Sequence, residues 1–145
     1  MRSLLVIEDG YEYEEFARLF LAEQFEVRAA HSSAEALGAL REHPADAFLV
    51  DLRFERSPVE DLVGDVHDTA KRRFAGDTFR AIRYLKEQQG TLVLAKIREA
   101  GFDGPAVFVH DFSTRRLANL QQLYGRVSAV PTFDAAKIRA ALEAA

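Results

Sequence analysis

The sequence predicts an α/β fold in which a five-stranded parallel sheet is covered by helices on both faces. Short apolar runs alternate with segments whose apolar residues recur every three or four positions, which is the pattern of βαβ units. The chain has 145 residues, 48% of them hydrophobic, and a chain of this size forms a core without a metal or disulfide. No internal repeat breaks the alternation, and we expect a single domain over residues 1–145.

The first half contains three predicted strands and two helices, each bounded by a recognisable stop signal. Acidic residues end the first and third strands, and Pro44 closes the second helix. In order, the elements are strand Leu4–Ile7, a helix over about residues 11–24, strand Phe25–Ala30, a helix that Ser32 or Ser33 can cap, and strand Ala47–Val50.

The second half repeats the pattern with two strands and three helices. Glycines follow two of the helices, and Asp134 can cap the last one. In order, the elements are a helix around Val93–Ile97 stopped by Gly101, strand Ala106–Val109, a helix from about Leu117 to Gly125, strand Val127–Val130, and a final helix through Ile138 and Leu142.

One segment breaks the alternation, because about 40 residues separate Asp51 from the helix at Val93. Loops between a strand and its helix usually have about 2–6 residues, so we expect an insertion over about residues 55–89, after the third strand. Its acidic residues come first and its basic residues follow. Phe79, Ile82 and Leu85 recur at every third position, and Asp77 can cap the segment, which predicts an extra helix over 78–88. Alternatively, this helix continues through Gly90 into the next one.

Acidic side chains stand at the ends of two predicted strands. Glu8 and Asp9 follow the first strand and Asp51 follows the third. In a doubly wound, flavodoxin-like sheet of order 2-1-3-4-5 these strands are neighbours, and ligands bind at their carboxyl ends. Three carboxylates there favour a hard divalent cation, Mg²⁺ above all. The competing interpretation is that an acid at a strand end caps a helix or is solvated, and it stays open for Glu8 and Asp9.

Several segments, in this order and spacing, resemble the receiver domain of two-component response regulators. The likeness spans nearly the whole chain apart from the insertion. The segments that carry it are Leu4–Gly10, Phe25–Ala30, Ser33–Leu37, Pro44–Leu52, Ala100–Val109 and Pro131–Asp134.

The resemblance implies a phosphorelay function. Asp51 would be the phosphoacceptor, taking a phosphoryl group from the histidine of a partner kinase. Glu8, Asp9, Asp51 and the backbone carbonyl of Arg53 would hold Mg²⁺, directly or through water. Phosphoryl transfer depends mainly on positioning and on neutralising charge, which this set of groups suits.

Two positions depart from the family. Receivers generally carry a Thr or Ser where this chain has His110, and a Lys where it has Val130. Valine neither donates a hydrogen bond nor neutralises the added charge of about −1.5 to −2. An atypical or pseudo-receiver that acts by protein contact, without phosphorylation, is therefore the alternative. A rescue by another cation is also open; the candidates are Arg53, Lys71, Arg72 and Arg73.

Other function classes have weaker support. His67-Asp68 and His110-Asp111 would suit a metal-dependent phosphohydrolase, but a dipeptide falls short of the three or more ligands that a catalytic metal needs. A net charge of −4 and the lack of stacking aromatics in the basic stretch 71–86 argue against nucleic-acid binding. The chain has no cysteine, which excludes disulfide, thiolate-zinc and thiol chemistry.

The expected partners are a histidine kinase or another signalling protein, with a homodimer as a further option. The amphipathic helix of the insertion is the expected contact surface. No apolar run approaches the roughly 20 residues of a membrane span, and Glu8 and Asp9 interrupt the first apolar run too early for a signal peptide. We therefore expect a cytoplasmic protein.

Overall fold

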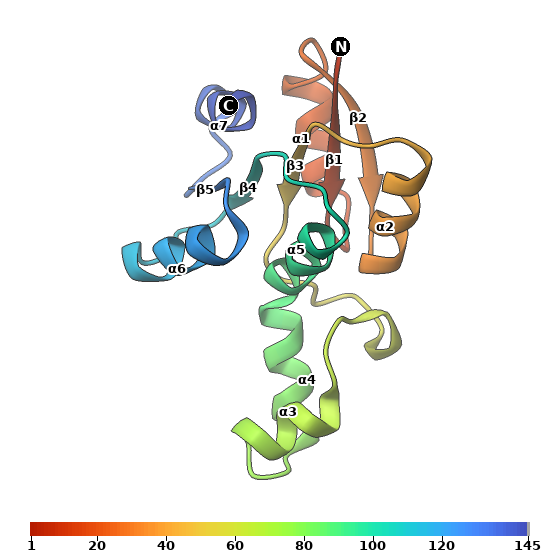
Figure 1. Cartoon of the computed structure of the whole chain (residues 1–145), viewed down its shortest axis with the longest axis vertical. Helices are drawn as coiled ribbons and strands as arrows, with labels where there is room; N and C mark the ends of the chain where they lie inside the picture. Colours follow the sequence, from red (N-terminus) through yellow and green to blue (C-terminus); the bar gives the residue numbers. More distant parts are fainter. Residues whose placement is uncertain (145) are drawn as a thin grey trace.

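A computed structural model describes residues 1–144 and contains one parallel sheet of order β2-β1-β3-β4-β5 (Figure 1). The predicted strand order is confirmed. In chain order the elements are β1 (Arg2–Ile7), α1 (Glu12–Phe20), β2 (Phe25–Ala30), α2 (Ser33–Glu42), β3 (Ala47–Val50), the 3₁₀ turn η1 (Val59–Asp61), α3 (Val66–Arg73), α4 (Thr78–Glu87), α5 (Gln89–Glu99), β4 (Ala106–Val109), α6 (Thr114–Tyr124), β5 (Val127–Val130) and α7 (Ala135–Glu143).

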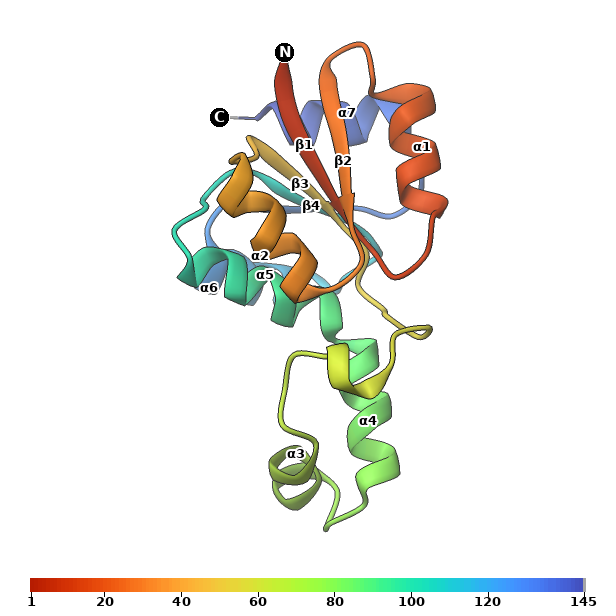
Figure 2. The same cartoon turned by 90° about the vertical axis from the view of Figure 1, so that its right-hand side faces the viewer.

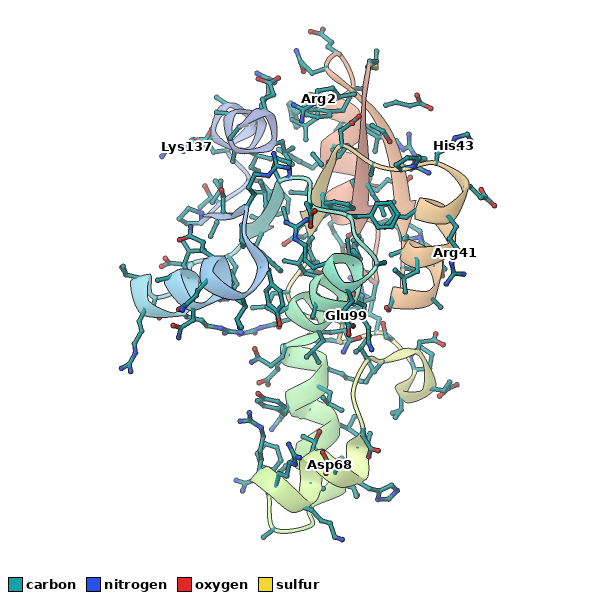
Figure 3. The ribbon with its side chains drawn as sticks, in the orientation of Figure 1. Arg2, Arg41, His43, Asp68, Glu99 and Lys137 are labelled. Carbon is teal, nitrogen blue, oxygen red and sulfur yellow. The ribbon has the colours of Figure 1, made fainter. Side chains whose placement is uncertain are left out.

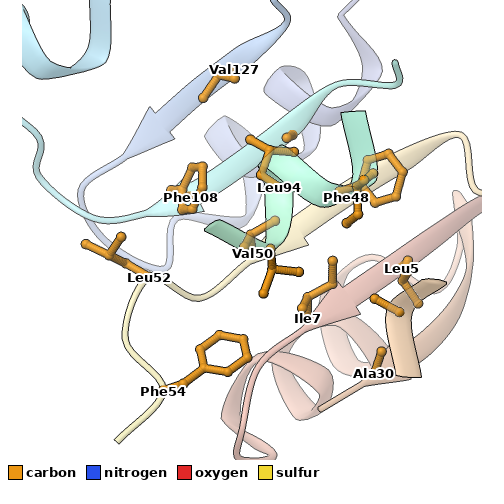
Figure 4. Packing of buried hydrophobic residues seen from close by; sticks show 14 of the residues in the cluster. Leu5, Ile7, Ala30, Phe48, Val50, Leu52, Phe54, Leu94, Phe108 and Val127 are labelled. Atoms are coloured by element: carbon orange, nitrogen blue, oxygen red, sulfur yellow. The ribbon is translucent and has the colours of Figure 1, made fainter. Parts of the chain in front are cut away.

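The sheet is buried on both faces, as the continuous apolar strands require. Helices α1 and α7 cover one face and α2, α5 and α6 cover the other (Figure 2). On the second face, Phe48 and Val50 of β3 and Phe108 of β4 pack against Leu94 of α5 (Figure 4). The two cores hold the carboxyl ends of β1 and β3 side by side, with Ile7 opposite Val50.

The predicted caps are confirmed, and one helix is shorter than predicted. Ser32, Asp77 and Asp134 each accept a hydrogen bond from a backbone N–H in the first turn of the following helix. Helix α1 ends at Phe20 rather than near residue 24. The helix ends early because the chain must turn before Phe25 begins β2. In this turn the carbonyl of Leu21 accepts hydrogen bonds from the N–H groups of Gln24 and Phe25.

Residues 55–88 form a projection that we call the arm. Helices α3 and α4 pack against each other there and extend away from the sheet beyond its carboxyl edge (Figures 1 and 2). The predicted helix over 78–88 is confirmed as α4, and only Gln88 separates it from α5. Helix α3 was missed, because its eight residues carry little apolar patterning beyond Val66 and Ala70.

Backbone hydrogen bonds fasten the base of the arm to the segment that follows β3. Phe54 donates to the carbonyl of Lys86 at 2.9 Å, and the N–H of Gly90 donates to the carbonyl of Leu52 at 2.8 Å. The buried Gln89 side chain accepts from Val63 N–H and donates to the carbonyls of Val63 and Leu85. The arm is therefore joined rigidly to the residues next to Asp51.

None of the helices in residues 1–144 has the length and apolar character needed to cross a membrane.

Gly90→Ala should destabilise the fold, because a Cβ there would lie 2.2 Å from the carbonyl oxygen of Asp51 and 2.9 Å from Leu52 Cα. Overpacking of this kind costs about 1–3 kcal/mol. Gly38→Ala in α2 is the matched control, since a Cβ there meets nothing within 4 Å, and it should stabilise by about 0.5–1 kcal/mol. Urea unfolding measures both changes, and equal effects of the two substitutions would contradict the close approach.

Candidate functional site

The candidate site lies at the carboxyl ends of β1 and β3, around the half-buried side chain of Asp51. The backbone N–H of Arg53 lies 3.4 Å from one of its carboxylate oxygens. Burial raises the pKa of Asp51 to about 6, and the negative charges of Asp9 and Glu8 push it in the same direction. The bond from Arg53 and the hydroxyl of Tyr13 oppose that rise. The acids that the sequence places near Asp51 thus help to raise its pKa.

Glu8 is directed at the start of α1 and is almost fully buried. One carboxylate oxygen accepts from Tyr13 N–H at 3.0 Å and the other from Glu14 N–H at 2.7 Å. These donors are among the unpaired N–H groups of the first helical turn. Burial nevertheless raises the pKa of Glu8 above its ordinary value. Glu8 therefore caps the start of α1. This role describes it better than the role of a direct metal ligand.

Asp9 contacts the beginning of the arm. Its carboxylate accepts from Arg56 N–H at 2.5 Å, while the Arg56 guanidinium forms an ion pair with Glu12 at 2.6 Å. This ion pair lowers the pKa of Glu12 to about 2. The guanidinium also lies against Gly10, where a Cβ would collide with it. Arg56 thus brings a positive charge to the edge of the acidic site.

Tyr13 belongs to the first turn of α1, and the charge of Asp51 influences its hydroxyl group. Its Oη lies 3.2 Å from the carbonyl oxygen of Val109, at the end of β4. Burial, with the nearby charge of Asp51, raises the pKa of Tyr13 far above its ordinary value. Tyr13 is therefore a neutral donor at this site.

The two positions that depart from the receiver pattern provide no cation. Val130 is buried in the core beneath α1 and α7. His110 is half-buried, and its ring packs edge-on against Phe112 at 4.7 Å between centroids. Burial lowers the pKa of His110, and the charges of Arg53 and Arg116 lower it further. His110 is therefore neutral at pH 7.

The four candidate cations lie in two separate places. Arg53 is exposed and close enough to His110 to influence its pKa, so it stands at the border of the site. Lys71, Arg72 and Arg73 belong to α3, in the outer part of the arm where Asp68 lies (Figure 3). There Arg72 pairs with Asp68, and Arg73 lies over the ring of Tyr84. In this arrangement, Arg53 is the only one of the four next to the site.

The chemistry of the donor set suits a hard cation only in part. Within residues 1–144, no group of three or more His, Cys, Asp or Glu side chains is arranged to hold a metal ion. Of the two His-Asp pairs, His67 lies on α3 in the arm, whereas His110 follows β4. Asp9 and Asp51 are the two oxygen donors whose mutual repulsion a cation would relieve.

Sequence reasoning missed Tyr13 and Arg56 as site residues. Tyr13 belongs to the apolar face of α1 together with Phe16 and Ala17, so its pattern predicts core packing alone. Its spacing of four residues from Asp9 was the only signal for its position. Arg56 lies in the insertion, whose path the sequence does not specify.

Comparisons with known proteins agree with this geometry at the level of the fold. No protein-family model and no curated protein matches the chain. Solved structures do match. NtrX from Brucella abortus has 16% identity and a TM-score of 0.63, over 98% of this chain and 27% of NtrX. The receiver domain of the Francisella response regulator 1452 has 12% identity and a TM-score of 0.64, over 98% of this chain and 93% of that domain.

A third match is a response regulator from Burkholderia pseudomallei with a phosphorylated aspartic acid, a calcium ion and citrate. It has 16% identity and a TM-score of 0.64, over 99% of this chain and 67% of that protein. This chain spans about a quarter of the NtrX chain but nearly all of the Francisella receiver domain. Together with the strand order, these matches show that the chain has the fold of response-regulator receiver domains.

Proposed function

We propose that this chain is a receiver-like signalling domain in which Asp51 accepts a phosphoryl group. The observation that carries the proposal is the position of Asp51 directly after β3, half-buried near Asp9 and Glu8. The donor would be the phosphohistidine of a kinase. The domain would act as a switch in the cytoplasm rather than as an enzyme that turns over substrate.

The transfer is an in-line displacement at phosphorus. An Asp51 oxygen forms the new bond to phosphorus as the bond to the kinase histidine nitrogen breaks, and the electron pair stays on the imidazole. Asp9, Asp51 and the Arg53 carbonyl would hold Mg²⁺, which would neutralise charge on the phosphoryl oxygens. We leave Glu8 out of the direct ligand set, because both of its oxygens accept helix N–H groups.

The alternative is a pseudo-receiver that is not phosphorylated. It draws support from the neutral His110 and the buried Val130, which leave the phosphoryl group without its usual partners. Arg56 favours it too, since its backbone occupies one oxygen of Asp9.

Incubation with Mg²⁺ and acetyl phosphate should add one phosphoryl group to the wild type and none to Asp51→Asn. The half-buried carboxylate of Asp51, at the strand end, provides the oxygen that attacks phosphorus. The side-chain amide of the Asp51→Asn variant has no oxygen of comparable nucleophilic strength. Intact-mass spectrometry detects the adduct, and Asp111→Asn, an exposed acid beyond β4, is the control that should still react. An unmodified wild type would favour the pseudo-receiver.

Asp51→Asn should also raise the melting temperature at pH 7.5, and the gain should shrink as the pH falls toward 4. The folded-state pKa of about 6 lies above the ordinary value of 3.8. Ionisation of Asp51 therefore destabilises the folded state, and the wild type loses stability as the pH rises from about 4 to 6. Calorimetry at several pH values measures the difference between variant and wild type. Asp61→Asn, at an exposed position of η1, is the control. A gain independent of pH would contradict the raised pKa.

We further propose that the arm is the surface that contacts an output partner. Phe79, Ile82, Arg83 and Lys86 share the face of α4 turned away from α3, and with Arg80 they line a groove of ≈ 550 Å³. Phe79 is 87% exposed. Glu55 and Glu87 line the inner end of the groove. Apolar groups between arginines suit an acidic, amphipathic segment of another protein, and repulsion between like charges disfavours pairing of two copies through this face.

A photo-cross-linking amino acid at position 79 should trap one acidic protein in cells, and Arg80→Glu with Arg83→Glu should abolish the product, because they reverse the charge beside the groove. Gel shift and mass spectrometry identify the product. The same cross-linker at Leu19, which is 76% exposed on α1, serves as the control. A product that survives charge reversal, or that contains a nucleic acid or a second copy, would refute this assignment.

A further inference from the structure

Arg56, at the start of the arm, contacts two acids near the beginning of α1. Its backbone N–H donates to Asp9 Oδ2 at 2.5 Å. Its guanidinium donates to both carboxylate oxygens of Glu12, at 2.6 and 3.4 Å. The two partners are 47 and 44 residues away in the sequence, so these bonds fasten the segment after β3 to the segment after β1.

Arg56 occupies a group that a metal ion would need. Asp9 and Asp51 are the side chains that would bind Mg²⁺, which requires close, nearly octahedral contacts to its oxygen ligands. The N–H of Arg56 already occupies Asp9 Oδ2. The guanidinium places a positive charge next to Gly10, the residue that follows Asp9, and like charges repel. Arg56 therefore supplies part of the neutralising charge that a cation would otherwise bring.

Gly10 makes room for the ion pair between Arg56 and Glu12. The residue is buried, and a Cβ built on it would overlap both the guanidinium and the carboxylate. Gly10 has no positive φ, so the contact requires the absence of a side chain rather than an unusual backbone conformation. A substitution at position 10 can therefore displace the ion pair without changing any charge.

We propose that Arg56 is an internal counter-cation of the acidic site, and that Asp9 becomes available to a divalent cation when Arg56 is released. The inference deepens the proposed function, on which it rests only for the binding of a cation at Asp9 and Asp51. Separate backbone bonds of Phe54 and Leu52 hold the base of α4, so the release concerns the start of the arm. Occupation of the site by a metal ion thus changes the conformation of the first residues of the arm.

The first experiment measures the affinity for Mg²⁺ by NMR titration of the backbone amides at constant ionic strength. Arg56→Gln should bind Mg²⁺ about five-fold more tightly than the wild type, because it loses the ion pair with Glu12 and one repelling charge. Arg18→Gln is the matched control, since it removes the same charge and an exposed ion pair with Glu14 on α1. Its affinity should stay within about two-fold of the wild type. An Arg56→Gln variant that binds Mg²⁺ no more tightly than the wild type, or in which neither protein binds it, would overturn the proposal.

The second experiment separates the contact from the charge. Gly10→Ala keeps every charge and pushes Arg56 away from Glu12, so this variant should also bind Mg²⁺ more tightly than the wild type. Gly38→Ala is the matched control, because a Cβ there meets nothing within 4 Å. A folded Gly10→Ala variant with the affinity of the wild type would overturn the proposal, even if Arg56→Gln binds Mg²⁺ more tightly.

The third experiment follows the Arg56 amide and needs no variant that must fold. Saturating Mg²⁺ should shift the NMR resonance of this amide and accelerate its exchange with water, because its acceptor on Asp9 is lost. For a wild type that binds Mg²⁺ too weakly to saturate, the same change should appear in Asp9→Asn, which removes the charged acceptor. An Arg56 amide whose exchange is unaffected would overturn the proposal. Release of Arg56 by Mg²⁺ without a phosphoryl adduct from acetyl phosphate would support this inference and contradict the proposed function.

Discussion

The constraint on which the site depends is the partial removal of the Asp51 carboxylate from water next to two other acids. Burial and the charges of Asp9 and Glu8 all disfavour its ionised form. Each neighbouring group limits this cost in its own way. Glu8 accepts from two helix N–H groups, and Asp9 accepts from the N–H of Arg56. The ionised form of Asp51 is therefore electrostatically unfavourable in the folded protein. Protonation, or the binding of a phosphoryl group together with a cation, would change this balance of charge.

The sequence predicts the sheet well because its signals are local. Strands Phe25–Ala30, Ala47–Val50, Ala106–Val109 and Val127–Val130 have the bounds that their apolar runs and stop residues indicate. The strand order follows from alternation with helices, since right-handed crossovers leave few arrangements. The caps at Ser32, Asp77 and Asp134 depend on nearest neighbours and are equally readable.

The site was predictable only in outline. Strand ends place Glu8, Asp9 and Asp51 near one another, but the direction of a side chain depends on which donors compete for it. Both carboxylate oxygens of Glu8 accept hydrogen bonds from N–H groups of α1. The return of Arg56 to Asp9 and Glu12 depends on the path of a long insertion, and no periodicity encodes that path. Tyr13 looks like a core residue in the sequence, and most of its surface is indeed buried.

The attachment of the arm has a mechanical consequence. One backbone hydrogen bond joins Phe54 to Lys86 and another joins Leu52 to Gly90, and Arg56 connects the same stretch to Asp9. The base of α4 is therefore fixed to the residues beside Asp51. If binding at the outer end of α4 changes the affinity of the Asp51 site, binding at the Asp51 site changes the affinity of α4 for its partner by the same factor.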